Sequence, residues 1–179
     1  MKALSIIIPV LNEQKSIVVR LSALQQLRSH GCEVILVDGG SVDNTVTLAQ
    51  PLVDQVLYSK KGRALQMNEG AAVASANILL FLHADTELPA GADKLVIRAV
   101  AESAYVWGWF RVKFRKQSLV FNMISRGMNW RALLTHICTG DQALFITRNL
   151  FESIRGFPEI PLMEDIAISK ILRLSLIHI

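Results

Sequence analysis

The sequence lacks most features of secreted, membrane-spanning and nucleic-acid-binding chains. Its two cysteines, Cys32 and Cys138, have no spacing typical of zinc sites or disulfide frameworks, so we expect reduced thiols and a cytoplasmic protein. No apolar run approaches the roughly 20 residues that cross a bilayer, and residues 1–10 lack a signal-peptide pattern. The net charge is +4, but only 19% of residues are charged, which is too few for the dense basic face of a typical nucleic-acid-binding protein. We therefore expect no nucleic-acid partner. An anionic small molecule and an anionic membrane surface both remain compatible with that charge.

The first half of the chain instead alternates short apolar segments with amphipathic ones. This order predicts a single α/β domain over residues 1–179, with a mostly parallel central sheet flanked by helices. The expected strands cover residues 5–10, 33–38, 55–58, 78–82, 105–114 and 143–146. The main expected helices run from Asn12 as a cap to Gly31, from Pro89 through residue 100, over 117–134, and from Glu164 onward.

Residues 105–134 mix aromatic and basic side chains. Strict alternation over 105–114 predicts a half-exposed strand, with Tyr105, Trp107, Trp109, Arg111 and Lys113 on its outer face. Two interpretations stay open: peripheral contact with an anionic membrane, or the wall of an acceptor site followed by an ordinary core helix.

Polar residues follow three of the expected strands. Asn12 and Glu13 follow the first, Asp38 ends the second, and His83 and Asp85 follow the apolar run Ile78–Leu82. Each of them alone is also compatible with a helix cap or a solvated turn. Parallel strands end at the same edge of a sheet, where α/β proteins bind ligands, so we expect these groups to converge.

Six segments, in this order, resemble the inverting glycosyltransferases of family 2, which have the GT-A fold. The first three are SIIIPVLNE from Ser5, VDGGSVDNT from Val37, and a segment that starts with KGRA at Lys61 and ends with NEG at Gly70. The last three are HAD from His83, TGDQ from Thr139, and Glu164-Asp165. The resemblance covers about residues 4–170 and implies transfer of a sugar from a nucleotide-diphosphate sugar to an acceptor, with inversion.

The resemblance also implies a donor site. Pro9, Leu11 and Glu13 match positions that line the nucleotide, and Asp38 matches the acid that binds the base. Gly39 replaces the second acid of the family's usual pair. Arg63 matches a basic position near the donor, where a cation can neutralise phosphate charge.

A divalent cation, Mn²⁺ or Mg²⁺, is the implied cofactor. Asp85 matches the last acid of the family's DxD metal motif, and His83 occupies the position of the first acid. Imidazole binds Mn²⁺ better than Mg²⁺, so this replacement leaves the identity of the metal open.

The implied catalytic base is Asp165, with Glu164 as the reserve candidate. The base would remove a proton from the attacking acceptor hydroxyl. Asp141 matches a residue that orients the acceptor or the metal. The sequence has no Ser/His/Asp or Cys/His pattern of a covalent nucleophile, consistent with a single displacement.

Alternatives to this transferase are a catalytically weak nucleotide-binding scaffold with the same fold and a sugar nucleotidyltransferase. Against the latter, the loop after the first strand has no glycine. The acceptor is unidentified, and a lipid-linked molecule, association with the inner face of the membrane and a homodimer are compatible with the sequence. Because residues 166–179 are apolar on nearly every face, we expect the natural domain to continue beyond Ile179.

Overall fold

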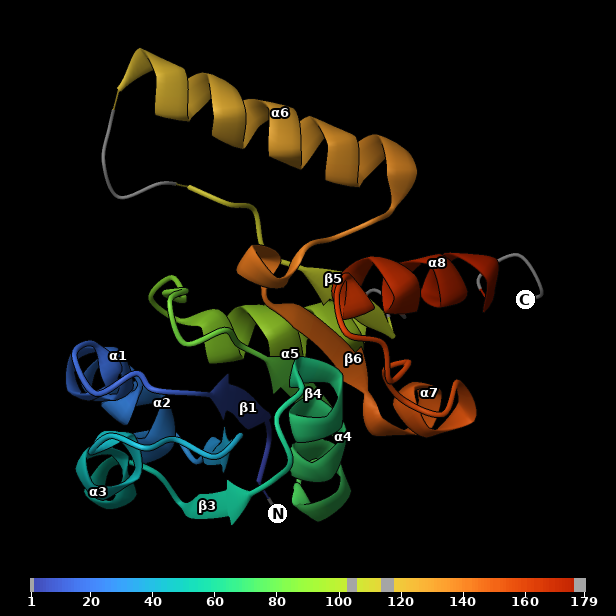
Figure 1. Ribbon diagram of the computed structural model, residues 1–179. Coiled ribbons are helices and arrows are strands. Elements are labelled where there is room, and N and C mark those ends of the chain that lie inside the picture. The colour runs from blue at the N-terminus through green and yellow to red at the C-terminus, as the bar shows by residue number, and fades with distance from the viewer. Residues whose placement is uncertain (1, 103–105, 114–117, 176–179) are drawn as a thin grey trace.

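A six-stranded sheet organises the protein, in a computed structural model that describes residues 2–102, 106–113 and 118–175 (Figure 1). The strand order is β3-β2-β1-β4-β6-β5. The strands are β1 (Ser5–Val10), β2 (Glu33–Asp38), β3 (Gln55–Tyr58), β4 (Ile78–Phe81), β5 (Trp107–Trp109) and β6 (Leu144–Thr147). Strands β1 to β4 pair in parallel, while β6 lies antiparallel between β4 and β5. The prediction of a mostly parallel sheet is confirmed.

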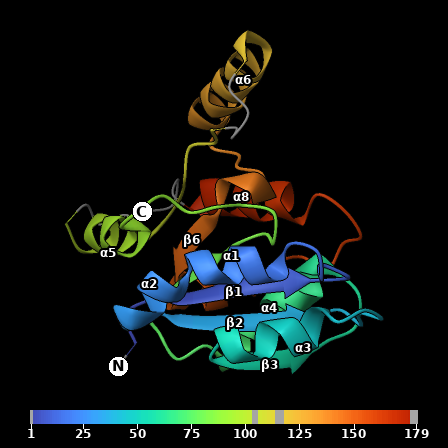
Figure 2. The same ribbon diagram turned by 90° about the vertical axis from the view of Figure 1, so that its left-hand side faces the viewer.

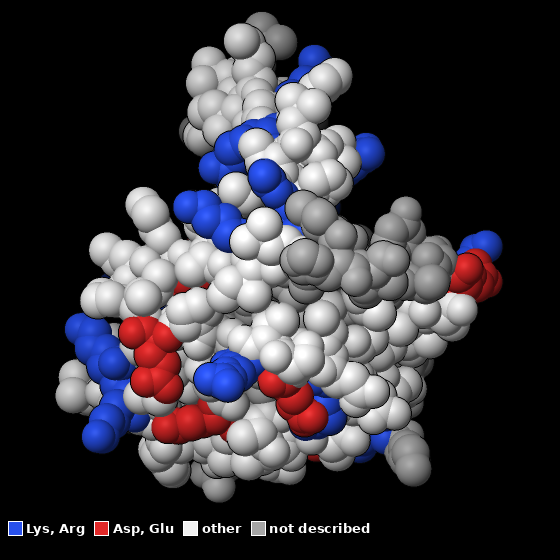
Figure 3. All heavy atoms as spheres, turned by 90° about the vertical axis from the view of Figure 1, so that its right-hand side faces the viewer, with Lys and Arg blue, Asp and Glu red and all other residues white. Residues whose placement is uncertain are grey.

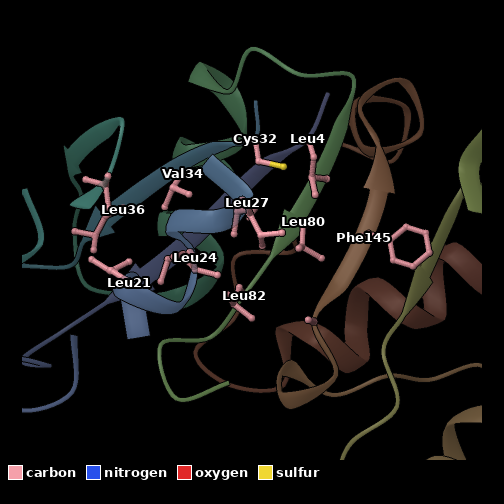
Figure 4. Close-up of a cluster of buried hydrophobic side chains, with 14 of the residues drawn as sticks. Leu4, Leu21, Leu24, Leu27, Cys32, Val34, Leu36, Leu80, Leu82 and Phe145 are labelled. Atoms are coloured by element: carbon pink, nitrogen blue, oxygen red, sulfur yellow. The ribbon is translucent and has the colours of Figure 1, made fainter. Parts of the chain in front are cut away.

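Helices cover both faces of this sheet (Figure 2). Their bounds are α1 (Ile17–Ala23), α2 (Gln25–Ser29), α3 (Thr45–Ala49), α4 (Arg63–Val73), α5 (Ala92–Glu102), α6 (Leu119–Thr135), α7 (Arg148–Ser153) and α8 (Glu164–Ser175). Short 3₁₀ helices, η1 and η2, form at Gln50–Leu52 and Gly140–Gln142. One core packs α1, α2 and α5 against the sheet (Figure 4), and a second packs α4, α7 and α8 against the opposite face.

Burial on both faces explains the continuous apolar strands. Every residue of β1, β2 and β4 is buried, and alternate residues contribute to the two cores. Helix α4 packs tightly on the sheet at Gly70, where an added Cβ would stand 2.5 Å from Cγ2 of Ile7. Glycine therefore sets the distance between this helix and β1.

Several local predictions were wrong. The first expected helix breaks at Leu24 into α1 and α2, and Asn12 does not cap it. Asn12 instead adopts a left-handed φ of 57°, and its Oδ1 accepts a hydrogen bond from the N–H of Val42. The helix expected from Pro89 begins at Ala92.

The strand expected over 105–114 is shorter than predicted. It covers Trp107–Trp109, and Tyr105 and Phe114 lie outside the described residues. Trp107, expected on an outer face, is buried in the second core. Both faces of the sheet are covered near this strand, because Trp107 packs into the second core and Phe110 packs against the first.

Helix α6 stands away from the layered body (Figures 1 and 2). Asn129 of α6 donates a hydrogen bond to the carbonyl of Val112 and accepts one from its N–H, both at 2.9 Å. Among the described helices, none is both long and apolar enough to cross a membrane.

The two thiols provide a test of this packing. Burial raises the pKa of both Cys32 and Cys138 to about 11, so roughly one thousandth of each is thiolate at pH 8. We expect iodoacetamide at pH 8 to label neither cysteine in the folded protein and both after unfolding in urea, as read by intact-mass spectrometry. Labelling of either thiol before the unfolding transition would contradict the packing around it.

Candidate functional site

A cleft of about 570 Å³ opens beyond the carboxyl ends of β1 and β4. Four parts of the chain line it. They are Pro9 in β1 with Leu11 and Glu13 after it, His83 and Asp85 after β4, Lys61 before α4 with Arg63 at its start, and Pro161, Leu162 and Glu164 before and within α8. The parallel strands bring the first two groups together, as predicted. The segment before α8 completes the cleft from a distant part of the chain.

His83 lies at the bottom of this edge and is 7% exposed. Its imidazole lies directly against Gly140 of η2, where an added Cβ would stand only 1.8 Å from Cε1 of His83. The φ of Gly140 is not in the left-handed region, so the ring rather than the backbone conformation requires glycine here. His83 and Gly140, which are 57 positions apart, thus form one packed unit.

Asp165 meets the same unit from α8. Its Oδ2 accepts a hydrogen bond of 2.9 Å from the N–H of Gly140, and its Oδ1 lies 3.9 Å from Nε2 of His83. Burial raises the pKa of the Asp165 carboxyl above its ordinary value; His83 lowers it and Glu164 raises it further. A carboxyl with a raised pKa holds a proton more readily than an exposed aspartate.

Glu164, the neighbouring acid, is 3% exposed. Its Oε1 is buried and has no hydrogen-bond partner among the described residues. A buried carboxylate oxygen without a partner is costly, and a cation or a ligand hydroxyl is a natural partner for it.

Two overlapping groups of side chains have the geometry of a cation site. Ligand atoms of His83, Asp85 and Asp141 lie within 4.8 Å of one another, and so do those of His83, Glu164 and Asp165. His83 belongs to both groups. The donor set of one imidazole and several carboxylates fits a divalent metal, and the unpartnered Oε1 of Glu164 is consistent with a missing positive charge.

Arg63 is the first residue of α4, and its side chain is exposed at the cleft. Lys61 lies just before it, and Gly62 between them has a φ of 153°. No acidic residue occupies the first turn of α4. The free N–H groups of this helix end and two cations together favour an anion in the cleft.

Asp38 differs from this cluster, because it is 2% exposed and does not line the cleft. Its Oδ2 accepts hydrogen bonds from the N–H groups of Gly40 and Ser41, and its Oδ1 accepts one from the Ser41 hydroxyl. Its contacts brace the loop after β2. Binding of a base by Asp38 stays a prediction.

A second cavity, of about 360 Å³, lies on the other side of Asp85. Its lining includes Arg20, Asp85, Glu87, Phe110, Arg111, Lys113 and Asp141. Asp85 thus separates two hollows, one beside Arg63 and one beside Arg111 and Lys113. Arg20 forms an ion pair with Glu87, whereas Arg111 and Lys113 are exposed.

Gln66 is a site residue that sequence reasoning missed. Its side chain is buried, and its Nε2 donates to the carbonyls of Val10 and Val37. It therefore joins the ends of β1 and β2 at the edge of the cleft. The available signal was a polar residue between Ala64 and Met67 on the apolar side of a helix, but the helix α4 itself was not predicted.

Comparison with known proteins identifies the class of this domain. The family model described as glycosyl transferase family 2 matches residues 5–153. In structure, the domain resembles S. aureus TarS 1-349 in complex with UDP, with a TM-score of 0.71 and 20% identity over 94% of this chain and 54% of that chain. The mannosyltransferase PcManGT of Pyrobaculum calidifontis, in complex with GDP-Man and Mn²⁺, gives a TM-score of 0.67 and 22% identity over 93% and 50% of the two chains. The fold and the match define a GT-A glycosyltransferase.

More particularly, the chain belongs to glycosyl transferase family 2. A curated relative is the undecaprenyl-phosphate 4-deoxy-4-formamido-L-arabinose transferase of Yersinia enterocolitica, which is 30% identical over 139 residues. That match covers 72% of this chain and 42% of the relative, so the chain spans less than half the length of the curated relatives it matches. The family assignment favours glycosyl transfer over the nucleotidyl transfer that the sequence left open.

The contact between His83 and Gly140 makes a specific prediction. Gly140→Ala should displace the imidazole and destabilise the fold by about 1–3 kcal/mol, the usual cost of overpacking, as measured by urea unfolding. In a His83→Ala background the same substitution should cost far less, because the clashing ring is gone.

Gly127 of α6 supplies the matched control, since an added Cβ there would meet no neighbouring side chain or loop within 4 Å. Gly127→Ala should leave the free energy of unfolding unchanged or raise it by up to about 1 kcal/mol. Additive effects of Gly140→Ala and His83→Ala would show that the ring does not impose the requirement for glycine.

Proposed function

We propose that this domain transfers a sugar from a nucleotide-diphosphate sugar to an acceptor, in a single, cation-assisted displacement with inversion. The observation that carries the proposal is the position of Asp165, which is anchored by Gly140 and lies next to His83 and Glu164, two residues that line the cleft. A half-buried carboxyl with a raised pKa, held by a backbone donor next to a cation site, has the properties of a general base.

The donor fits the larger cleft. Lys61, Arg63 and the N-terminus of α4 supply positive charge for a diphosphate, and Pro9 and Leu11 supply an apolar wall for a nucleoside. The TarS structure holds UDP and the PcManGT structure holds GDP-Man with Mn²⁺, which supports the same class of donor here.

The proposed cation site consists of His83 and Asp85, with Asp141 within reach. A site that combines imidazole and carboxylate ligands favours Mn²⁺ over Mg²⁺. When bound there, a divalent cation neutralises charge on the departing nucleoside diphosphate. We also propose a cytoplasmic location, supported by the two buried free thiols.

Asp165 performs the proton transfer. The N–H of Gly140 fixes Oδ2, which leaves Oδ1 to accept the proton of an acceptor hydroxyl. Attack on the anomeric carbon from the side opposite the leaving diphosphate inverts that centre. Glu164, deeper in the fold, raises the pKa of Asp165 and is the reserve candidate for the base.

The acceptor is proposed to bind in the second cavity and to carry a phosphate. Arg111 and Lys113 line this cavity, and both can pair with phosphate oxygens. The name of the Yersinia relative includes undecaprenyl-phosphate, which supports a lipid-linked phosphate as the acceptor class.

Nucleotide binding should depend on both metal and Asp85. At about 100 times the dissociation constant, UDP or GDP with Mn²⁺ should raise the unfolding temperature by about 5–10 °C, and the nucleotide alone by much less. Asp85→Ala should abolish the metal-dependent part. Glu102→Ala, an exposed acid on α5, is the control and should behave as wild type. An equal shift with EDTA present would argue against a cation between protein and nucleotide.

Asp165→Asn separates the roles of base and structural residue. Asparagine Oδ1 can still accept the Gly140 N–H. An ionised Asp165 costs stability as pH rises from about 4 through its raised folded-state pKa. At pH 7 in EDTA we therefore expect an unfolding temperature equal to or above wild type.

Transfer by the same variant should fall by about 10²–10⁴ if a hydroxyl attacks. If the acceptor phosphate itself attacks, it is already ionised, and a fall of less than about tenfold would reassign Asp165 to positioning. A lower unfolding temperature together with lost transfer would mean that Asp165 is chiefly structural.

A further inference from the structure

The outer side of α6 combines exposed apolar side chains with positive charge. The outer stripe of α6, as we define it, consists of Val120, Met123, Ile124, Trp130 and Leu134. Helical spacing places these residues along one side, and Met123, Trp130 and Leu134 are 72%, 66% and 73% exposed. The opposite side contains the buried Ser125 and Ala132. The outer stripe therefore lies on the side of α6 that nothing covers in the described part of the chain.

The positive charge of the chain is concentrated in the sequence segment that contains this helix. Residues 103–140 contain six of the 19 Lys and Arg residues and none of the 15 Asp and Glu residues. The remaining sequence has 13 cations and 15 acids, a formal charge of −2, so this segment accounts for the whole positive net charge. On the face seen in Figure 3, the protruding part carries Lys and Arg and no visible Asp or Glu.

We propose that the outer stripe of α6 docks on an anionic lipid bilayer, with the helix lying in the plane of the interface. Exposed apolar residues enter the boundary between headgroups and acyl chains, while Arg126 and Arg131, both exposed, reach anionic headgroups. Five apolar side chains, including a tryptophan, make lipid a better match than a nucleic acid or an acidic protein, which charge alone would attract.

The position of α6 also connects this surface to the second cavity. Val112, held to α6 through Asn129, lines that cavity together with Arg111 and Lys113. Docking would hold this cationic cavity close to the lipid surface. The docking itself does not depend on the proposed transfer reaction.

Vesicle binding tests the proposal with the full chain. We expect co-sedimentation with vesicles of 70% POPC and 30% POPG, little with pure POPC, and loss of binding in 0.5 M NaCl. Met123→Gln/Trp130→Gln should weaken binding at least about tenfold, and Arg126→Gln or Arg131→Gln about fivefold each. Leu95→Gln and Arg98→Gln on α5 are matched exposed controls and should bind as wild type.

Tryptophan fluorescence gives a readout that is independent of sedimentation. The emission should shift to shorter wavelength with POPG vesicles, and Trp130→Phe should remove the shift while binding persists. Light scattering of the protein without vesicles measures its oligomeric state and shows whether a second copy covers the outer stripe of α6. A dimer that Met123→Gln/Trp130→Gln dissociates, without vesicle binding, would assign the stripe to a second copy and overturn the proposal. Vesicle binding unchanged in the α6 variants, or no binding at all, would overturn it as well.

Discussion

The contact of three segments at Gly140 determines the geometry of the site. The His83 ring from the end of β4 occupies the space of an absent side chain at Gly140, and the Gly140 N–H holds Asp165 of α8. A backbone donor and a close-packed ring fix the carboxylate more firmly than flexible side chains would. Because His83 also lies within reach of Asp85 and Asp141, one imidazole links the candidate base to the candidate cation site.

Burial of the central strands explains why they could be predicted from the sequence. Strands β1, β2 and β4 are buried on both faces, so their sequences are continuous apolar runs that end where the sheet meets water. The predicted ranges 5–10 and 33–38 match the structure, and the predicted 78–82 ends one residue too late. The range 55–58 also matches, although β3 is only partly buried. Helices at the surface are less constrained, which is why the break at Leu24 and the helices α4 and α7 were not predicted.

The site could be predicted only in part. Acids at strand ends and at the start of a helix follow from chain order. In the structure they form two groups that share His83, one with Asp85 and Asp141 and the other with Glu164 and Asp165. Other contributions depend on long-range contacts that no local pattern reports. Pro161 and Leu162 reach the cleft from the segment just before α8, and Gln66 is recognisable only once the ends of β1 and β2 are placed. Asp38 illustrates the reverse case, because its hydrogen bonds to its own turn are invisible in the sequence.

The candidate catalytic residues and the proposed lipid-binding surface lie on different parts of the molecule. His83, Glu164 and Asp165 lie at the sheet edge and on α8, where packing resists displacement, and the sequence outside residues 103–140 has a formal charge of −2. The outer stripe and two exposed arginines, Arg126 and Arg131, lie on α6, which is held to the strand side of the chain through the hydrogen bonds between Asn129 and Val112. A substitution on the outer side of α6 therefore changes what the surface attracts without moving Asp165 or His83. Binding of the donor, in contrast, acts directly on the sheet edge, where a diphosphate and its counter-charges must be balanced against several buried or half-buried carboxylates.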